Sequence, residues 1–492
     1  MSHSILLGGA DGKQILLDAG MANRHGLITG ATGTGKTITL QVLAESFSRL
    51  GVPVFAADIK GDLSGVAKAG SEHPKIAERV SSIGIAEHVF EGCPTLFWDV
   101  QGDKGHPVRT TVSEMGPVLL SNLLALNETQ EGVLHIAFAV ADEQGLLLLD
   151  LKDLRAMLNW VGDNAQDLSR QYGHVARQSV TAILRRLLVL EESGGDRFFG
   201  EPALRIDHLL QSDFSGRGVI SLLDATSLYS NARIYATFLL WLLSELMEEL
   251  PERGDAPLPK LIFFFDEAHL LFDKAPPALL ERITQVVRLI RSKGVGVFFV
   301  TQYPNDVPDE VIGQLGNRIQ HALRAFTPRD RKALKAAAET FRPNPAFDTV
   351  AVIAELGLGE ALISTLDGKG VPSMVERTLI APPRSRIGPV TTQERGEILA
   401  RSPLLDAYEK TLDRESAFEQ LKRREAELDS LRKQGTYGQE GAAPATGGNS
   451  RRAGRGRQTT VESLAKSLMR SLGSSLGRSI ARGILGSITG RR

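Results

Sequence analysis

The sequence has few of the features that cross-link a protein through disulfides or metal ions, or that anchor it in a membrane. It contains one cysteine, Cys93, among 492 residues, which excludes an intramolecular disulfide and leaves too few thiolates for a zinc site. Its most apolar helical stretch, residues 236–250, contains three glutamates and is too short and too charged to cross a bilayer. The N-terminus lacks the basic region and apolar core of a signal peptide. We therefore expect a cytoplasmic protein, which agrees with a reducing compartment.

A charge excess of either sign is also lacking. The 57 lysines and arginines balance 58 aspartates and glutamates, for a net charge of -1 at pH 7. No global field attracts nucleic acid, so any basic surface must be local. Hydrophobic residues make up 42% of the chain, which is ordinary for a globular protein. The length exceeds what one compact core usually organises, so we expect more than one unit.

The apolar pattern predicts an α/β fold interrupted by a helical module. HGLITG reads as a strand, ATGTGKT as a loop, ITLQVLAESFSRLG as a helix and PVFAAD as a second buried strand. This alternation is typical of a mainly parallel sheet flanked by helices. From about residue 110 apolar residues recur at helical spacing, and strand patterns return at 218–225, 261–265 and 296–300. The sheet is therefore expected to come from two separated parts of the chain.

A phosphate-binding loop follows the first strand. Residues 30–37 match G-x-x-x-x-G-K-[ST] in full, and the match lies between a strand and a helix, which argues against a mere glycine-rich turn. The backbone N–H groups would converge on phosphate oxygens at the positive end of the helix. Lys36 would neutralise phosphate charge and Thr37 would ligate Mg²⁺. We predict an ATP site made of Gly30, Ala31, Thr32, Gly33, Thr34, Gly35, Lys36 and Thr37.

Two acids end a later strand. Five apolar residues, 261–265, precede Asp266 and Glu267. Asp266 would hold Mg²⁺ through water, and Glu267 would polarise the attacking water as a general base. The alternative is that the two acids only cap the next helix, because acids favour a helix N-terminus. The presence of the phosphate loop favours the catalytic interpretation.

A third strand, residues 296–300, ends in Thr301 and Gln302. Gln302 can sense the terminal phosphate or orient water, and we expect three adjacent strands to end at one site. Hydrolysis of this kind often needs an arginine from a neighbouring subunit. Arginine side chains on helices are usually solvated, so the residues alone leave several candidates open: Arg288, Arg291, Arg324 and Arg331.

Together these motifs resemble the HerA/FtsK superfamily of ATPases. The resemblance is carried by GLITGATGTGKT, ADIKGDLSG, IFFFDEAHLLF, RLIRSKGVGVFFVTQ and GNRIQHALRAFTPRDRKAL, over roughly residues 1–390. Within the superfamily the combination looks like the YjgR-type HerA-like branch. The resemblance implies a RecA-like core of the additional-strand type, assembled as a homo-oligomeric ring, a hexamer, with ATP at subunit interfaces. It also implies Arg291 as the finger arginine and places Asp58 near the phosphates.

The sequence also departs from the relatives it resembles. Only about 29 residues precede Gly30, which leaves no room for the β-barrel that precedes the phosphate loop in HerA helicases. Membrane helices and a winged-helix DNA reader, as in FtsK-type pumps, are not visible. Tyr303 stands where an arginine commonly follows the sensor glutamine. These departures bear on the substrate rather than on the ATPase.

The predicted organisation has six parts. They are a first core part at 1–109, a helical insertion at 110–212, a second core part at 213–385, a charged helical segment at 386–434, a linker at 435–458 and a basic tail at 459–492. In the tail, apolar residues recur every four positions from Leu464 to Ile488 with basic residues between them. A disordered tail, a membrane-surface helix, a phosphate-binding helix and packing against a sister helix remain open.

The preferred functional interpretation is ATP hydrolysis coupled to the movement or remodelling of DNA by a ring. The alternative is an ATPase that remodels a protein complex or acts at a membrane surface through the tail. A small-molecule phosphotransferase is disfavoured, because Glu267 and Gln302 suit the activation of water.

Overall fold

The structure is a computed structural model that describes residues 3–10, 12–228, 232–254, 256–273, 277–325 and 327–437. They form two compact units, which we call the sheet unit and the helical unit. Of the described residues, the sheet unit comprises those up to Arg109 together with Pro202–Lys410, and the helical unit comprises Thr110–Glu201 together with Thr411–Tyr437. The predicted tail at 459–492, and the predicted linker from residue 438 on, lie outside the described residues.

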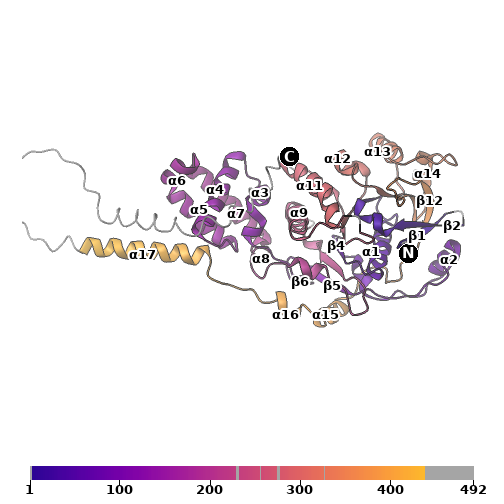
Figure 1. The fold of residues 1–492 in the computed structure, drawn as a ribbon, viewed down its shortest axis with the longest axis horizontal. Helices are drawn as coiled ribbons and strands as arrows, with labels where there is room; N and C mark the ends of the chain where they lie inside the picture. Colours follow the sequence, from indigo (N-terminus) through magenta and orange to yellow (C-terminus); the bar gives the residue numbers. More distant parts are fainter. Residues whose placement is uncertain are drawn as a thin grey trace, which may run out of the picture. The chain divides into compact units, whose positions relative to one another are not determined.

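The sheet unit is built on one twelve-stranded sheet (Figure 1). From β10 to β6 all neighbouring strands are parallel, and from β2 to β10 they are antiparallel. In spatial order the strands are β2 (Lys13–Asp18), β1 (Ser4–Ala10), β12 (Glu376–Ile380), β11 (Glu360–Ser364), β10 (Asn317–His321), β3 (Gly26–Thr29), β9 (Val295–Thr301), β8 (Leu261–Phe265), β4 (Val54–Asp58), β7 (Ile220–Asp224), β5 (Thr95–Asp99) and β6 (His106–Pro107). The mainly parallel α/β fold predicted from the sequence is confirmed.

The central strands are buried along their whole length and mainly apolar, because helices cover both faces of the sheet. In β4, β7, β8 and β9 every residue is buried. On one face Phe264 and Phe298 share a core with Phe47 of α1 (Lys36–Arg49). Successive side chains of a strand point to opposite faces, so Phe265 and Phe299, which stack at 5.1 Å, lie on the other face. Figure 1 shows α9 (Ala232–Glu249) and α11 (Pro277–Ile290) on that side.

The strand order places one strand between the phosphate-loop strand and the strand of the acidic pair. β9 pairs with β3 on one side and with β8 on the other. In register, Thr29 lies opposite Thr301 and Phe265 lies opposite Phe299. Since parallel strands end at the same edge, the residues that follow these three strands meet there. This is the additional-strand arrangement that the resemblance implied.

A C-terminal strap, residues 381–410, returns along the sheet unit and is fixed to the helix that follows the phosphate loop. Glu45 of α1, 3% exposed, accepts hydrogen bonds from the backbone N–H groups of Arg384 at 2.8 Å and Ser385 at 3.1 Å. Farther along, His106 contacts Ser402 and Glu409 at 2.6 and 2.7 Å. The strap contains α15 (Thr392–Ala400) and α16 (Leu405–Tyr408).

Elsewhere in the sheet unit, shorter helices and 3₁₀ turns pack around the sheet. Beside β10 and β11, α13 and α14 enclose a second apolar core that includes Leu334, Ile353 and Leu362. These remaining elements are α2 (Pro74–Ile83), α10 (His269–Phe272), α12 (Asp309–Ile312), α13 (Pro328–Glu339), α14 (Thr349–Glu355) and the 3₁₀ turns Ala19–Arg24, Leu63–Ala67, Ile206–Leu209, Thr226–Leu228, Arg291–Lys293 and Pro304–Asp306.

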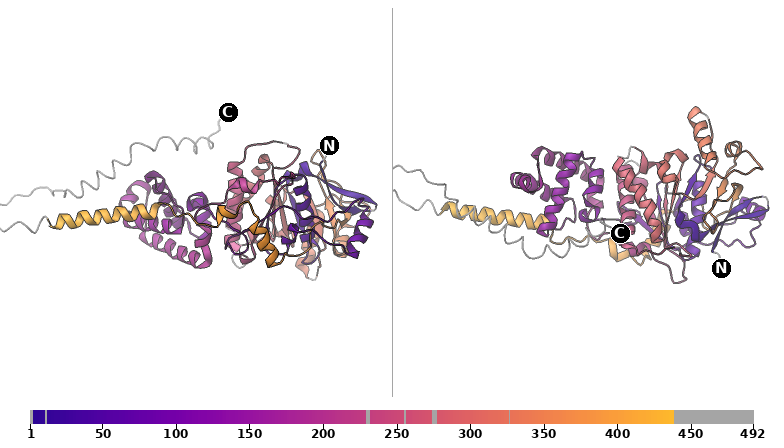
Figure 2. Two further views of the ribbon diagram at one scale, coloured as in Figure 1. Left: turned by 90° about the horizontal axis from the view of Figure 1, so that it is seen from below. Right: turned by 45° about the horizontal axis from the view of Figure 1, so that its top comes forward.

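The helical unit is an all-α module joined by the last described helix. Its helices are α3 (Val112–Leu123), α4 (Glu128–Gln144), α5 (Leu151–Asp163), α6 (Ala165–Tyr172), α7 (Arg177–Leu190), the short α8 (Asp196–Phe198) after the π-type turn Glu191–Gly195, and α17 (Ala417–Tyr437). Capping boxes fix the starts of α3, α4 and α5. In both views of Figure 2 the beginning of α17 lies against this module, and it packs on α5.

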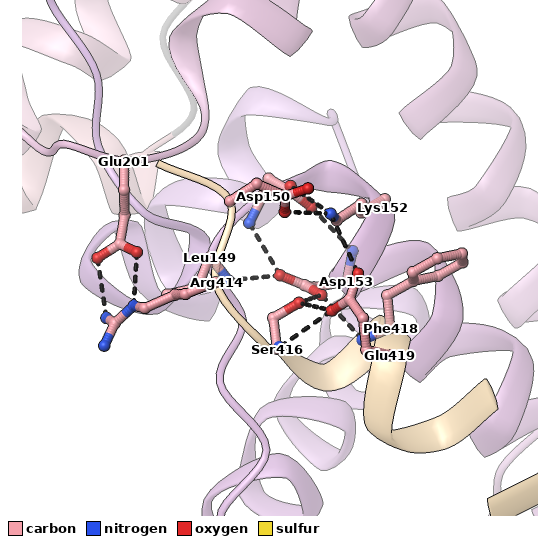
Figure 3. A network of polar contacts seen from close by, with 10 residues as sticks. Leu149, Asp150, Lys152, Asp153, Glu201, Arg414, Ser416, Phe418 and Glu419 are labelled. Carbon is pink, nitrogen blue, oxygen red and sulfur yellow. Dashed lines mark hydrogen bonds and ion pairs between the residues drawn. The ribbon is translucent and has the colours of Figure 1, made fainter. Parts of the chain in front are cut away.

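A polar network attaches α17 to α5 (Figure 3). The carboxylate of Asp153, fully buried, accepts hydrogen bonds from the hydroxyl of Ser416, from Phe418 N at 2.9 Å and from Leu149 N at 2.9 Å. Lys152 pairs with Asp413 at 2.7 Å and with Glu419 at 3.2 Å, and Arg414 forms a two-pronged pair with Glu201 at 2.6 and 2.8 Å. Because a buried carboxylate must be hydrogen-bonded, Asp153 fixes the start of α17 on this unit.

Candidate active site

The phosphate loop connects β3 to α1 in a conformation that requires glycine. Gly30, Gly33 and Gly35 have φ angles of 150°, 77° and 117°, values that residues with a side chain rarely adopt. A Cβ atom on Gly30 would also lie 2.5 Å from Cβ of His321. The loop is held from two sides, because Gly30 N donates to Gln302 O at 3.2 Å and Ala31 N donates to Ala322 O at 2.8 Å.

The first residues of α1 face this loop. Helix α1 begins after Gly35 without any capping side chain, so its first N–H groups are free to bind an anion. Lys36, 5% exposed, donates to Gly30 O at 2.6 Å and to Ala31 O at 3.2 Å. Burial lowers the pKa of Lys36, and the nearby ammonium of Lys60 lowers it further. Thr37 is partly exposed beside it.

The acidic pair follows β8. Asp266 is 6% exposed, and burial raises its pKa to about 6. Glu267 has a φ of 47°, which is strained for a residue with a side chain, and Ala268 N fixes the turn by donating to Val300 O at 2.8 Å. Burial works to raise the pKa of Glu267, but its close contacts with the side chains of His269 and Lys60 lower it to about 2. Lys60 Nζ lies 2.6 Å from Glu267 Oε1.

Asp58 shapes the neighbouring turn after β4. Its carboxylate, 3% exposed, accepts hydrogen bonds from Gly61 N at 2.7 Å and Leu63 N at 3.0 Å. Burial, together with repulsion from Asp62, raises the pKa of Asp58 to about 7. Gly61 has a φ of 77°, so glycine permits the turn. In this structure Asp58 therefore stabilises the turn that presents Lys60.

Gln302 stands at the end of β9 with its backbone bonded to the phosphate loop, and its side chain is partly exposed. The residues on either side of Gln302 are held by Asp306, which sequence reasoning missed. Asp306 accepts hydrogen bonds from Thr301 Oγ1 at 2.8 Å and from Tyr303 N at 2.9 Å. Asp306 follows Gln302 by four positions inside an irregular segment, where no pattern marks it. Tyr303, in the position noted above, contacts Asp330 at 3.4 Å.

Two buried histidines join neighbouring elements of the sheet unit, His321 beside the phosphate loop and His25 at the opposite end of β3. His321 of β10, fully buried, contacts Thr39 Oγ1 at 2.8 Å and Glu360 O at 3.0 Å. Since the carbonyl can only accept, Nδ1 of His321 carries the proton and Nε2 accepts from Thr39. His25, 2% exposed, has the opposite tautomer, because its Nε2 donates to Val287 O and its Nδ1 accepts from Val297 N. Burial lowers the pKa of both imidazoles to about 4.

On acidification the sheet unit should gain stability through Asp58 and Asp266, whose pKa values are raised to about 7 and 6, and should lose stability through these two histidines. The folded pKa of each histidine is about 4, below the ordinary value of 6.5, so the unfolded chain takes up the proton first as the pH falls. The stability contributed by each histidine is complete above about pH 6.5 and is lost between 6.5 and 4, by about 2 kcal/mol for each histidine between pH 7 and 5. In the wild type the two carboxyl groups offset this loss. Urea unfolding at pH 7 and 5 measures this change. From pH 7 to 5 the free energy of unfolding of His25→Asn should change more favourably than that of the wild type by about 2 kcal/mol, whereas the same exchange at the exposed His73 should make no such difference. The same pH dependence in both variants would contradict this assignment.

Arg291 does not join the other candidates within one chain. It opens the 3₁₀ turn Arg291–Lys293 before β9, close enough to His25 to lower the pKa of that imidazole. The seven residues of β9 separate it from Gln302 by about 20 Å. Of the other arginines, Arg324 is bonded to Ala354 O and Leu356 O, and Arg288 is exposed on α11.

The donor chemistry at the phosphate loop fits magnesium. The candidate ligands, the Thr37 hydroxyl and the Asp266 carboxylate, are oxygen atoms, which Mg²⁺ prefers. The described part of the chain contains no group of three or more His, Cys, Asp or Glu side chains suited to hold a metal alone. Mg²⁺ usually takes one or two protein ligands and completes its shell with water and substrate phosphates, so this arrangement is the one expected for a nucleotide-borne ion.

A phosphate loop between a buried strand and a helix, with one strand inserted before the acidic strand, defines a P-loop NTPase of the additional-strand class. Comparison with family models makes the assignment specific. The model "Helicase HerA-like C-terminal" matches residues 4–492, so the chain belongs to this family, and the HerA/FtsK-type ATPase predicted from the motifs is confirmed.

Comparison with solved structures finds distant similarities. The plasmid coupling protein TrwB in complex with ADP and Mg²⁺ is 14% identical, with 77% of this chain and 90% of that chain covered and a TM-score of 0.49. VirB4 of Thermoanaerobacter pseudethanolicus is 17% identical, with 76% and 96% covered and a TM-score of 0.47. A search of curated proteins gives no match. The family assignment therefore rests on the family model.

No helix in the described ranges is long and apolar enough to cross a membrane.

Proposed function

We propose that the protein is a cytoplasmic, Mg²⁺-dependent ATPase that assembles as a homo-oligomeric ring, a hexamer, and couples ATP hydrolysis to the movement or remodelling of DNA. One observation supports the chemistry above all others. The phosphate loop, the acidic pair and Gln302 follow three adjacent parallel strands, β3, β8 and β9, at one edge of the sheet. The residues proposed to bind phosphate, to hold the metal and to activate water therefore follow neighbouring strands, which supports the proposal.

Each side chain takes a role that its position allows. The loop backbone and Lys36 bind the phosphates, while Thr37 and Asp266 hold Mg²⁺. Magnesium held there would supply positive charge to neutralise the charge that develops on the transferring phosphoryl group. Glu267 is the general base for the attacking water, and Gln302 orients that water or senses the terminal phosphate. Arg291 comes from a neighbouring subunit.

Coupling to DNA rests on family membership rather than on a basic surface, because the chain as a whole has a net charge of -1. The alternative is an ATPase that remodels a protein complex or works at a membrane surface through its basic tail. The two functions make opposite predictions for DNA. A motor that follows DNA phosphates is stimulated by DNA, and the stimulation falls with salt because contacts to phosphates release counterions.

The deciding experiment measures steady-state ATP hydrolysis with and without duplex DNA at low salt. Glu267→Gln serves as the blank, because it keeps the shape of the site and removes the base; we expect it to lower turnover by about 100-fold or more. DNA should stimulate wild-type turnover several-fold, and added salt should abolish the stimulation. Turnover that is lost in the blank but indifferent to DNA would retain the ATPase and favour the alternative. Turnover that persists in the blank would refute the assigned chemistry.

A further inference from the structure

The candidate base is held by a lysine to which the proposed mechanism assigns no role. Lys60 Nζ lies 2.6 Å from Glu267 Oε1, which is the distance of a short charge-assisted hydrogen bond. Glu267 is 5% exposed at its side chain, whereas Lys60 is 35% exposed. A buried carboxylate gains more from a partner than an exposed one. This ion pair, together with the contact of His269 Nδ1 with Glu267 Oε2 at 3.3 Å, therefore fixes where the Glu267 carboxylate points.

The turn that carries Lys60 is built to keep this contact. Asp58 accepts hydrogen bonds across the turn from the backbone N–H groups of Gly61 and Leu63. A Cβ atom on Gly61 would lie 3.3 Å from Thr226 Cγ2, so the turn is also packed against the end of the neighbouring strand. On the other side the strained φ of Glu267, 47°, limits how its backbone can respond. Both partners of the ion pair are thus presented by rigid backbone.

Lys60 also stands beside the phosphate site. Its ammonium group is close enough to Lys36 to lower the pKa of that lysine, and Asp266 and Glu267 act on Lys36 in the opposite direction. Asp306 acts on Lys36 in the same direction as these two acids, so two cations and three acids share one small region. An anion placed at the phosphate loop would attract Lys60 and repel Glu267, and so it would compete with Glu267 for the same ammonium group.

We propose that Lys60 is a positioning residue that restrains Glu267 while the nucleotide site is empty, and that it exchanges this carboxylate for the terminal phosphate of bound ATP, which releases Glu267 toward the attacking water. The exchange preserves a charge-assisted contact for Lys60 throughout. ADP lacks the terminal phosphate and leaves the ion pair in place. The restraint thereby makes the base available only when a hydrolysable nucleotide is bound.

This inference rests on the proposed ATPase, but a binding experiment separates the two. Affinities are measured calorimetrically for a non-hydrolysable ATP analogue and for ADP, both with Mg²⁺, so turnover plays no part. Glu267→Gln removes the competitor and should tighten binding of the analogue about tenfold, which corresponds to one charge-assisted hydrogen bond, without changing ADP binding. Lys60→Met keeps the apolar stem of the side chain and should weaken the analogue about tenfold, again without changing ADP.

The double variant distinguishes an exchange of partners by Lys60 from simple repulsion between Glu267 and phosphate. If Lys60 exchanges partners, Lys60→Met combined with Glu267→Gln should bind the analogue like Lys60→Met alone, because the competitor matters only through the lysine. A full tenfold tightening by Glu267→Gln in the Lys60→Met background would overturn the proposal, as that result would mean simple repulsion between Glu267 and phosphate. Equal weakening of the analogue and ADP by Lys60→Met would also overturn it, since it would mean a merely structural role.

Two further variants serve as controls. Lys60→Arg retains the positive charge and should restore at least half of the lost preference for the analogue over ADP. Lys75→Met makes the same exchange at an exposed lysine of α2 and should leave both affinities unchanged. If the wild type hydrolyses ATP but the binding pattern fails, the exchange is wrong and the ATPase stands. If the binding pattern holds but no turnover is found, the proposed function fails instead.

Discussion

Gly30→Ala is expected to abolish nucleotide binding while the protein stays folded. Gly30 has a φ of 150°, and an added Cβ would lie 2.5 Å from Cβ of His321 and 2.9 Å from Thr34 Oγ1. The strained backbone and the collision together cost about 2–6 kcal/mol. The loop can relieve this strain by moving away from β10, so the protein stays folded. The displaced loop then no longer has the geometry that binds phosphate. We expect affinity for ATP and ADP to fall by about 30-fold or more, as measured by calorimetry.

The matched control is Gly12→Ala. Gly12 also has a positive φ, 76°, but an added Cβ would meet nothing within 4 Å, so only the conformational cost remains. It should leave nucleotide affinity within about twofold of wild type. Circular dichroism and thermal unfolding establish that both variants fold. Wild-type affinity in Gly30→Ala would show that the loop does not need the observed conformation to bind phosphate.

The sheet and its catalytic edge were predictable because their signals are local. Each central strand is a continuous apolar run, as parallel strands covered on both faces must be, and each candidate residue directly follows such a run. The loop at 30–37, the pair Asp266 and Glu267, and Gln302 could therefore be placed at one sheet edge before the strand order was known. Their roles in catalysis stay predictions.

The N-terminal hairpin of β1 and β2 escaped sequence reasoning for a physical reason. Gly8 and Gly9 weaken the strand pattern of β1, because glycine has low strand propensity. In the fold, however, a Cβ on Gly8 would lie 2.1 Å from Leu379 O of β12. The glycine is there because the backbones approach closely. The feature that hides the strand from sequence analysis is the feature that allows it to pair.

Contacts between distant segments were equally hidden. The sequence places Lys60 after one strand and Glu267 after another, but only the order β8–β4 in the sheet brings them together. Asp153 reads as an ordinary capping residue of α5, which it is. Nothing in its surroundings indicates that it also holds Ser416 and Phe418 at the start of α17. Such pairs depend on topology, which local patterns do not encode.

Arg291→Ala and Lys36→Ala are each expected to be inactive, and mixing them should restore activity. Within one chain Arg291 lies at the opposite end of β9 from Gln302, about 20 Å away, so it cannot reach its own phosphate loop without refolding the sheet. In a ring with head-to-tail contacts it would reach the loop of a neighbour. Loss of a finger arginine lowers turnover by about 1,000-fold or more, and loss of Lys36 removes phosphate binding.

The mixture tests this geometry directly. In an equimolar random ring about a quarter of the interfaces combine an intact phosphate loop with an intact arginine, so turnover should recover to as much as about a quarter of wild type. Subunit exchange is verified with two fluorescent labels. Arg288→Ala, an exposed arginine on the preceding helix, should be active alone and is the control for removing charge near this turn. Inactive mixtures with verified exchange would exclude action across the interface, because each mixed ring would then hold complete sites that do not work.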